Sequence, residues 1–184
     1  NIEYWSGTRR ILVAACSESE LYVALTALDA DAAARRIPID KPLWKASFPF
    51  LAPLVDRLDG DARWDRFETV RMPRWSTGRA VVIGDAAHAM APNLGQGGAC
   101  AMMNALGLAV ALDEIADVPA ALAAWERRER PLTDHTQRWS TIYSALTTLP
   151  DRWRSAAFYT AARVPWIRRQ HQRTMRHHPT GTLS

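Results

Sequence analysis

The first part of the chain alternates hydrophobic and polar positions with the period of β-strands. Two β-prone runs, Arg10 to Cys16 and Glu20 to Leu28, are separated by the polar residues 17–19. In the second run, leucine or valine recurs at every second position from 21 to 25. Two such runs joined by a short polar turn predict an antiparallel hairpin.

A helical period follows. Pro38 and Pro42 precede the stretch from Leu43 to Leu58, in which large hydrophobic side chains recur three or four positions apart. This spacing predicts a helix with one buried face. Gly60 would end it, and the run from Trp64 to Met72 then predicts another strand.

The most informative pattern lies between Arg79 and Leu112. An apolar run, Ala80 to Ile83, ends at Gly84-Asp85, and a loop then leads to a glycine cluster at 95–98 and an apolar helical stretch. This order predicts a strand, a loop and a helix N-terminus. A carboxylate at the strand end and free N–H groups at the helix start would together suit a ligand with hydroxyls at one end and an anionic group at the other.

The remaining pattern predicts further helices. Pro119 opens one that runs to Arg130, Pro131 is expected to interrupt it, and a second runs from about Leu132 to Leu146. The charged positions 126–130 indicate a solvated face. A short helix is expected over 151–162, followed by a solvated or subunit-contacting Arg-rich tail at 163–178 and disorder over 179–184.

Composition narrows the class of protein. The 184 residues are 48% hydrophobic and 23% charged, and the longest apolar run is far too short to cross a bilayer. The two cysteines form neither a disulfide framework nor a metal cluster, which favours a reducing compartment and a cytoplasmic location. The net charge of the chain is +4. Residues 152–184 contain seven arginines and no acid, so residues 1–151 carry a net charge of −3. No nucleic-acid, membrane or metal partner is therefore expected.

The central motif carries a family resemblance. The order G-D-A-A-H-x-x-x-P-x-x-G-Q-G, followed by a helix of small residues, resembles the second FAD-contacting motif of the single-component flavoprotein aromatic hydroxylases. Weaker similarity, in P-I-D-x-x-x-W and A-W-E-x-R-x-R-P, points to members that oxidise pyridine-ring acids. The chain lacks the fingerprint G-x-G-x-x-G that would hold the ADP half of FAD. It is thus similar to the C-terminal portion of such a protein, and a missing N-terminal portion is expected as its partner.

The resemblance implies a fold and a division of the chain. The fold class is α/β, with α+β elements, as the C-terminal portion of a two-domain FAD-binding monooxygenase. Residues 1–72 would form a substrate-side sheet and helix, 73–146 the FAD-binding portion, and 147–184 a C-terminal helix with a basic tail. The oligomeric state stays open, with a homodimer as one alternative.

The resemblance also assigns candidate site residues. Asp85 would accept hydrogen bonds from the ribityl chain of FAD, and Pro92 would shape the face of the flavin where oxygen reacts. His88 could act as a general base or could brace the loop, and the motif favours the second role. The other cofactor-binding candidates are Gly84, Gly95, Gly97, Gly98 and Ala99. Two departures stand out, because the family often has Asn at position 99 and an acid at position 104.

The implied function is FAD-dependent hydroxylation of an aromatic or heteroaromatic acid. NADH or NADPH would reduce the flavin, and dioxygen would form a hydroperoxide at its C4a atom. Two alternatives remain open. One is a non-catalytic remnant of the fold that serves as a binding or interaction module, and the other is a related flavoprotein epoxidase or halogenase.

Overall fold

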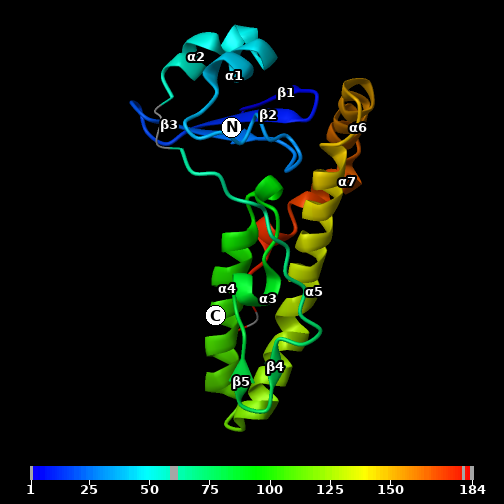
Figure 1. Cartoon of the computed structure of the whole chain (residues 1–184). Coiled ribbons are helices and arrows are strands. Elements are labelled where there is room, and N and C mark those ends of the chain that lie inside the picture. Colours follow the sequence, from blue (N-terminus) through cyan, green and yellow to red (C-terminus); the bar gives the residue numbers. More distant parts are fainter. Residues whose placement is uncertain (1, 59–61, 180, 183–184) are drawn as a thin grey trace. The chain divides into compact units, whose positions relative to one another are not determined.

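The computed structural model describes residues 2–58, 62–179 and 181–182, so the expected helix end at Gly60 lies outside the described residues. The chain divides into two compact units (Figure 1). The first comprises Asn1–Arg66 and Thr147–Ser155, and the second comprises Phe67–Leu146 and Ala156–Ser184.

A three-stranded antiparallel sheet forms the base of the first unit. Its strands are β1 (Ile2–Ser6), β2 (Arg9–Ala15) and β3 (Leu21–Thr26), in that order. Val13 of β2 lies opposite Ile2 on one side and Val23 on the other. The predicted hairpin is confirmed as β2 and β3, whereas β1 was not expected from the sequence.

Two prolines divide the predicted helix at 43–58 into shorter pieces. The structure has α1 (Lys41–Ser47), the 3-10 turn η1 (Pro49–Leu51) and α2 (Ala52–Asp56). The side chain of Asp40 caps α1 by accepting a hydrogen bond from the Leu43 N–H at 3.1 Å. Phe48 has φ of −134°, outside the helical region, as expected for a residue before a proline.

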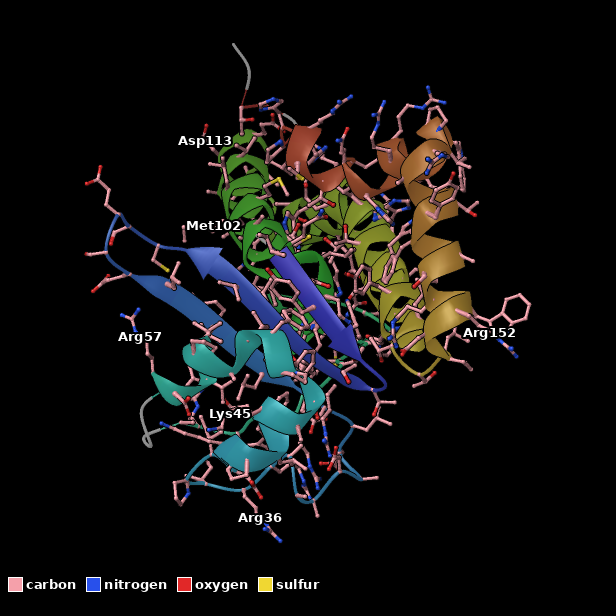
Figure 2. The ribbon with its side chains drawn as sticks, turned by 90° about the horizontal axis from the view of Figure 1, so that it is seen from above. Arg36, Lys45, Arg57, Met102, Asp113 and Arg152 are labelled. Atoms are coloured by element: carbon pink, nitrogen blue, oxygen red, sulfur yellow. The ribbon has the colours of Figure 1, made fainter. Side chains whose placement is uncertain are left out.

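The predicted buried face of these helices is nevertheless confirmed. Trp44, Phe48 and Val55 are fully buried and form one core cluster with Ile11 of β2. Lys45 of α1 and Arg57, the C-cap of α2, are less buried and are labelled in Figure 2. The hydrophobic period therefore placed the buried side chains correctly, although the helix is broken.

The later segment of the first unit is tied to the β1–β2 turn by one arginine. Arg154 is 3% exposed, donates a hydrogen bond to the Gly7 carbonyl at 2.7 Å, and lies over the Trp5 ring at 4.7 Å from its centroid. Arg154 lies on α6 (Asp151–Arg163), a helix that was predicted almost residue for residue.

The predicted strand at Trp64 to Met72 is wrong. This segment has no regular secondary structure and forms no ladder with any strand among the described residues. Its backbone is held at Val70, whose N–H donates to the Ala89 carbonyl at 3.0 Å and whose carbonyl accepts from the Gln137 side chain at 2.7 Å. These isolated bonds satisfy the backbone without a neighbouring strand.

The second unit is built on two long helices that lie side by side (Figure 1). They are α4 (Gly97–Glu114) and α5 (Val118–Leu146). The expected interruption at Pro131 is wrong, because α5 continues through it. Proline costs about 3 kcal/mol inside a helix. Buried contacts on both sides of it, from Trp125 to Ser140, offset this cost.

Short elements connect the first unit to α4. They are the two-stranded ladder β4 (Ser76–Thr77) and β5 (Ala80–Val81), the one-turn helix α3 (Asp85–His88) and the 3-10 turn η2 (Pro92–Leu94). Trp75, just before β4, is 2% exposed and packs against Trp125 with ring centroids 5.5 Å apart. The predicted strand, loop and helix are thus present, with a strand shorter than expected.

The basic tail is folded rather than simply solvated. It contains α7 (Pro165–His171) and the 3-10 turn η3 (Thr174–Arg176). Thr174 is 2% exposed, and its hydroxyl lies 2.5 Å from that of Thr136 on α5. Gly181 lies against α4, close to Val110. Positions 180, 183 and 184 of the segment expected to be disordered lie outside the described residues.

Helix α4 is apolar around most of its circumference. It buries Cys100, Asn104, Gly107 and Ala111, while Met102 (Figure 2), Leu106 and Leu112 are exposed. Two apolar side chains at the end of the preceding strand, Val81 and Ile83, are exposed as well. No helix within the described ranges is long and apolar enough to span a membrane.

Candidate flavin site

A glycine turn places the first candidate residue, Asp85, at the surface. Gly84 has φ of 60° and ψ of −143°, a conformation essentially restricted to glycine, and it ends the extended segment abruptly. Asp85 therefore begins α3 with an exposed side chain. No hydrogen bond to its carboxylate is recorded from the described residues, so both oxygens are available to a ligand.

The N-terminus of α4 is the second part of the site. Its N-cap residue is Gln96, but the Gln96 side chain donates to the His171 carbonyl at 2.8 Å and does not cap the helix. The first N–H groups of α4, on Gly97, Gly98 and Ala99, are therefore left without a side-chain cap. Such groups and the helix dipole favour negative charge at this end of the helix.

Glycine keeps the approach to this helix end open. A Cβ atom added at Gly98 would meet no atom within 4 Å, whereas one at Gly97 would contact Met90 at 3.5 Å. Gly95 adopts the left-handed conformation, with φ of 63°, and turns the chain into α4. A flat ring can consequently approach the backbone at Gly98 without steric hindrance.

Polar side chains of α5 hold the loop between these two parts. Ser140 donates to the Ala91 carbonyl at 2.6 Å, and Gln137 donates to the Ala89 carbonyl at 2.9 Å. The Asn93 amide contacts the Ser144 hydroxyl at 2.5 Å. Pro92, between these anchors, is exposed at the start of η2. Its rigid ring therefore lies on a loop whose backbone is fixed on both sides.

Sequence reasoning missed these anchoring residues. They recur at positions 137, 140 and 144, three and four residues apart, on the inward face of α5. A polar stripe on a helix face that is otherwise buried indicates hydrogen bonds to a neighbouring loop, because buried polar groups are almost always paired.

His88 lies in the core behind the loop. It is 1% exposed, its Nε2 atom lies 2.9 Å from the Asn104 amide nitrogen, and its ring packs on Trp75 at 5.2 Å. Burial lowers the pKa of His88 below 6.5, against smaller opposing effects of its own backbone, Asp85 and Asp134. The ring is therefore neutral at pH 7, and its Nδ1 atom has no hydrogen-bond partner among the described residues. This environment favours the bracing role over that of a general base.

Asn104 connects α3, α4 and α5. Its side-chain amide donates to Thr133 at 3.1 Å as well as contacting His88, and its backbone carbonyl accepts from the Trp125 indole at 2.8 Å. Where the family often has an acid, this chain has a neutral amide that is 2% exposed. The amide can donate to a neutral histidine without placing a charge in the core.

Glu126 and Arg130 hold the backbone segment that leads into β4. The Glu126 carboxylate accepts from the N–H groups of Trp75 at 3.0 Å and Ser76 at 3.1 Å, and from Arg130 at 2.7 Å. Arg130 also donates to the carbonyls of Met72 and Pro73, each at 2.8 Å. The expectation of a solvated face at 126–130 is therefore wrong for Glu126 and Arg130, which bind the backbone that leads into β4, and for Glu129, which is 2% exposed.

The pKa of Glu126 reflects this arrangement. Burial would raise the pKa, but the hydrogen bonds from Trp75, Arg130 and Ser76 outweigh it and hold the pKa below 4.5. The carboxylate is consequently ionised at neutral pH and acts as a fixed acceptor.

Taken together, these features fit the reactive half of a flavin. An exposed carboxylate is free to accept hydrogen bonds from hydroxyls, and an open, uncapped helix N-terminus is free to receive a flat ring that becomes negatively charged. Both flank one braced loop. The class defined by this fold and site is a flavin-binding protein.

Comparison with known proteins gives the family. A family model described as "FAD binding domain" matches residues 51–140. A putative 2-heptyl-3-hydroxy-4(1H)-quinolone synthase of Rhodococcus erythropolis is 43% identical over 183 residues, which are the whole of this chain and 48% of that protein. Kynurenine 3-monooxygenase of Stenotrophomonas maltophilia is 40% identical over 95 residues, covering 48% of this chain and 20% of the relative.

Solved structures agree with this result. The tetrameric form of 2-methyl-3-hydroxypyridine-5-carboxylic acid oxygenase is 38% identical, with a TM-score of 0.75 over 93% of this chain and 43% of the other. HpxO of Klebsiella pneumoniae, solved with FAD and uric acid, shares the fold with a TM-score of 0.78 at 21% identity, over 94% of this chain and 47% of that one. The chain matches a part of the FAD-dependent aromatic monooxygenases, as its central motif predicted. It spans about half the length of the curated relatives it matches.

Proposed function

We propose that the protein containing this chain is an FAD-dependent monooxygenase that hydroxylates an aromatic or heteroaromatic ring. NADH or NADPH would be the reductant. The observation that carries the proposal is the pairing of the free Asp85 carboxylate with the uncapped start of α4 across one braced loop. When bound, FAD supplies the redox chemistry, taking electrons from the nicotinamide and activating dioxygen.

The chain's own residues bind and orient in this proposal. Asp85 accepts hydrogen bonds from the hydroxyl chain of the cofactor, and the N–H groups at Gly97 and Gly98 stabilise negative charge at one edge of the flat ring. Pro92 presents an apolar surface without an N–H donor, which helps to exclude water. His88 does not contact the cofactor in this proposal; it holds α3 against α4 through Asn104.

The names of the relatives suggest the substrate class. Quinolone, kynurenine and pyridine-carboxylic acid are all nitrogen-containing aromatic compounds or acids. We therefore expect the substrate to be an electron-rich aromatic or heteroaromatic ring. The test uses the full-length protein reconstituted with FAD, and it measures NADH and NADPH oxidation across a panel of such compounds. If FAD binds but no compound stimulates oxidation, the protein is a binding module rather than a hydroxylase.

A variant tests the site itself. Asp85→Ala should weaken FAD binding by about tenfold to a hundredfold, because a hydrogen bond to a charged group contributes about 1.5–3 kcal/mol. Asp113→Ala is the matched control, since Asp113 is also an exposed acid and lies near the opposite end of α4 (Figure 2). Flavin fluorescence titration gives both dissociation constants. Equal FAD affinity in the two variants would remove Asp85 from the site.

A further inference from the structure

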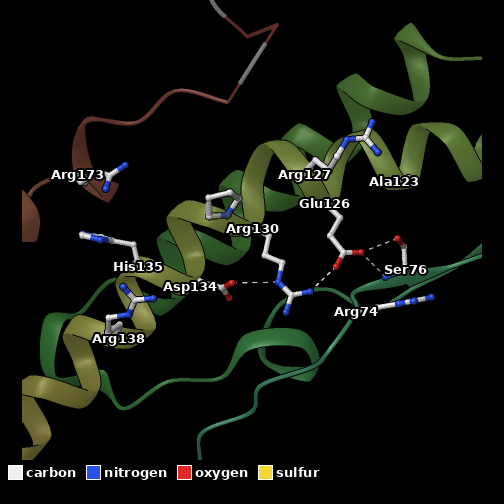
Figure 3. Close-up of a pocket in the computed structure, with 11 residues that line it drawn as sticks. Arg74, Ser76, Ala123, Glu126, Arg127, Arg130, Asp134, His135, Arg138 and Arg173 are labelled. Atoms are coloured by element: carbon white, nitrogen blue, oxygen red, sulfur yellow. Dashed lines mark hydrogen bonds and ion pairs between the residues drawn. The ribbon is translucent and has the colours of Figure 1, made fainter.

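An open groove of about 880 Å³ runs along α5 within the second unit (Figure 3). Its floor is one face of the helix, where Arg127, Asp134 and Arg138 follow one another at spacings of seven and four residues. Arg74, from the segment before β4, lines the groove, as does Arg173 from the segment before η3. None of its lining residues is a candidate flavin-site residue.

The charges in this groove are unbalanced. Five arginines line it, at positions 74, 127, 130, 138 and 173, against two acids, Glu126 and Asp134. Both acids bind Arg130, at 2.7 Å and 3.3 Å, and Glu126 is also occupied by backbone N–H groups. The other four arginines are exposed, and no acidic partner is recorded for them among the described residues. Four like charges on one concave surface repel one another, and a bound anion relieves that repulsion.

The arginines are spread along the groove. Arg127 and Arg138 are eleven residues apart on α5, so their backbones are separated by about 16 Å along the helix axis. An elongated ligand follows this row of arginines further than a single phosphate group does, and each guanidinium offers the paired donors that phosphate oxygens accept. The groove volume lies within the range of small-molecule sites.

We propose that the α5 groove binds the phosphate groups of an elongated nucleotide, of the class of nucleoside diphosphates and dinucleotides. Two sources share this chemistry. One is the nicotinamide dinucleotide required by the proposed function, and the other is a separate nucleotide such as ADP. The basic tail contributes to the site because Thr174, next to Arg173, is anchored on α5 through Thr136.

Binding of ADP, NADH and NADPH to the full-length protein tests this proposal. The protein is saturated with FAD beforehand, so that ADP cannot enter the site of the cofactor's own ADP half. In isothermal titration calorimetry, Arg127→Gln combined with Arg138→Gln should weaken nucleotide binding at least about tenfold, because two charge-assisted contacts are lost. Flavin content should not change, since neither residue is a candidate flavin-site residue.

The matched control combines Arg128→Gln with Arg169→Gln, which removes the same charge outside the groove. Arg128 lies on α5 but pairs with Glu114 of α4 at 2.7 Å, and Arg169 is exposed on α7. The proposal is overturned if the wild-type protein binds none of the three nucleotides at about 1 mM, the weakest affinity of interest. It is equally overturned if control and groove variants lose affinity to the same extent.

Steady-state kinetics then separate the two sources. If the groove variant raises KM for NADH or NADPH and leaves kcat unchanged, the ligand is the reductant. If it weakens ADP binding alone, the groove serves a separate nucleotide. Because binding is measured directly, a protein that binds ADP through these arginines but hydroxylates nothing would support the groove and refute the proposed function.

Discussion

Replacement of Glu126 by alanine should destabilise the flavin half-site although Glu126 is not a candidate ligand of the cofactor. Its carboxylate is 15% exposed and accepts hydrogen bonds from Trp75 N–H, Ser76 N–H, the Ser76 hydroxyl at 2.9 Å and Arg130. Alanine would leave two backbone N–H groups without this acceptor. Each unpaired buried donor costs about 1–3 kcal/mol, and a bond to a charged group contributes about 1.5–3 kcal/mol.

These values do not add, because Arg130 keeps its bonds to Met72, Pro73 and Asp134. We expect a net loss of about 3 kcal/mol in the free energy of unfolding. Thermal unfolding of the full-length protein, followed by the release of flavin fluorescence, should show this loss as a clear fall in the midpoint. Glu126→Gln should lose less, since its amide oxygen can still accept a hydrogen bond from one of the N–H groups.

Glu114→Ala is the control for this measurement. Glu114 also pairs with an arginine of α5, Arg128 at 2.7 Å, but its side chain is 40% exposed. An exposed pair of this kind contributes about 0–1 kcal/mol. If Glu126→Ala lowers the midpoint no more than Glu114→Ala does, then Glu126 does not anchor β4 and the reasoning fails.

The structure supports three further predictions. Wild type should have a larger free energy of unfolding than Glu126→Gln above about pH 4.5. This difference should disappear as the pH falls through the lowered pKa of Glu126, because protonation removes the charged acceptor. Denaturation curves at several pH values check this. Asn104→Leu should cost about 2–4 kcal/mol by urea unfolding, since it leaves buried His88 and Thr133 without their amide partner, and equal stability would contradict the described network. Gly84→Ala should reduce FAD affinity and stability by about 1–3 kcal/mol, because alanine rarely adopts the backbone conformation of Gly84; a flavin titration that matches wild type would show that the turn tolerates a side chain.

Local patterns were sufficient to predict much of the architecture. The hairpin of β2 and β3, the buried face around Trp44, and the order of strand, loop and α4 all follow from spacing and turn residues. The breaks in the first helix and the continuity of α5 through Pro131 did not follow. The breaks come from Pro49 and Pro53, a local signal that the prediction set aside in favour of the helical period. The continuity of α5 depends on packing across the chain, which a window of neighbouring residues does not contain.

The candidate site shows the same division. Gly84, Asp85 and the glycines around the start of α4 could be proposed as site residues because their sequence order is itself the signal. Glu126, Gln137 and Ser140 were missed because each acts on backbone about fifty residues away. Such residues resemble ordinary polar positions of a helix until the loop that they hold is known.

Helix α4 exposes large apolar side chains, and this exposure affects the solution behaviour of the chain. Met102 is 71% exposed and Leu106 49% exposed, and Ile83 at the end of the preceding strand is 44% exposed. Large apolar side chains that remain exposed to water favour aggregation or association with another protein surface. A protein surface that covers these side chains of α4 would remove this liability.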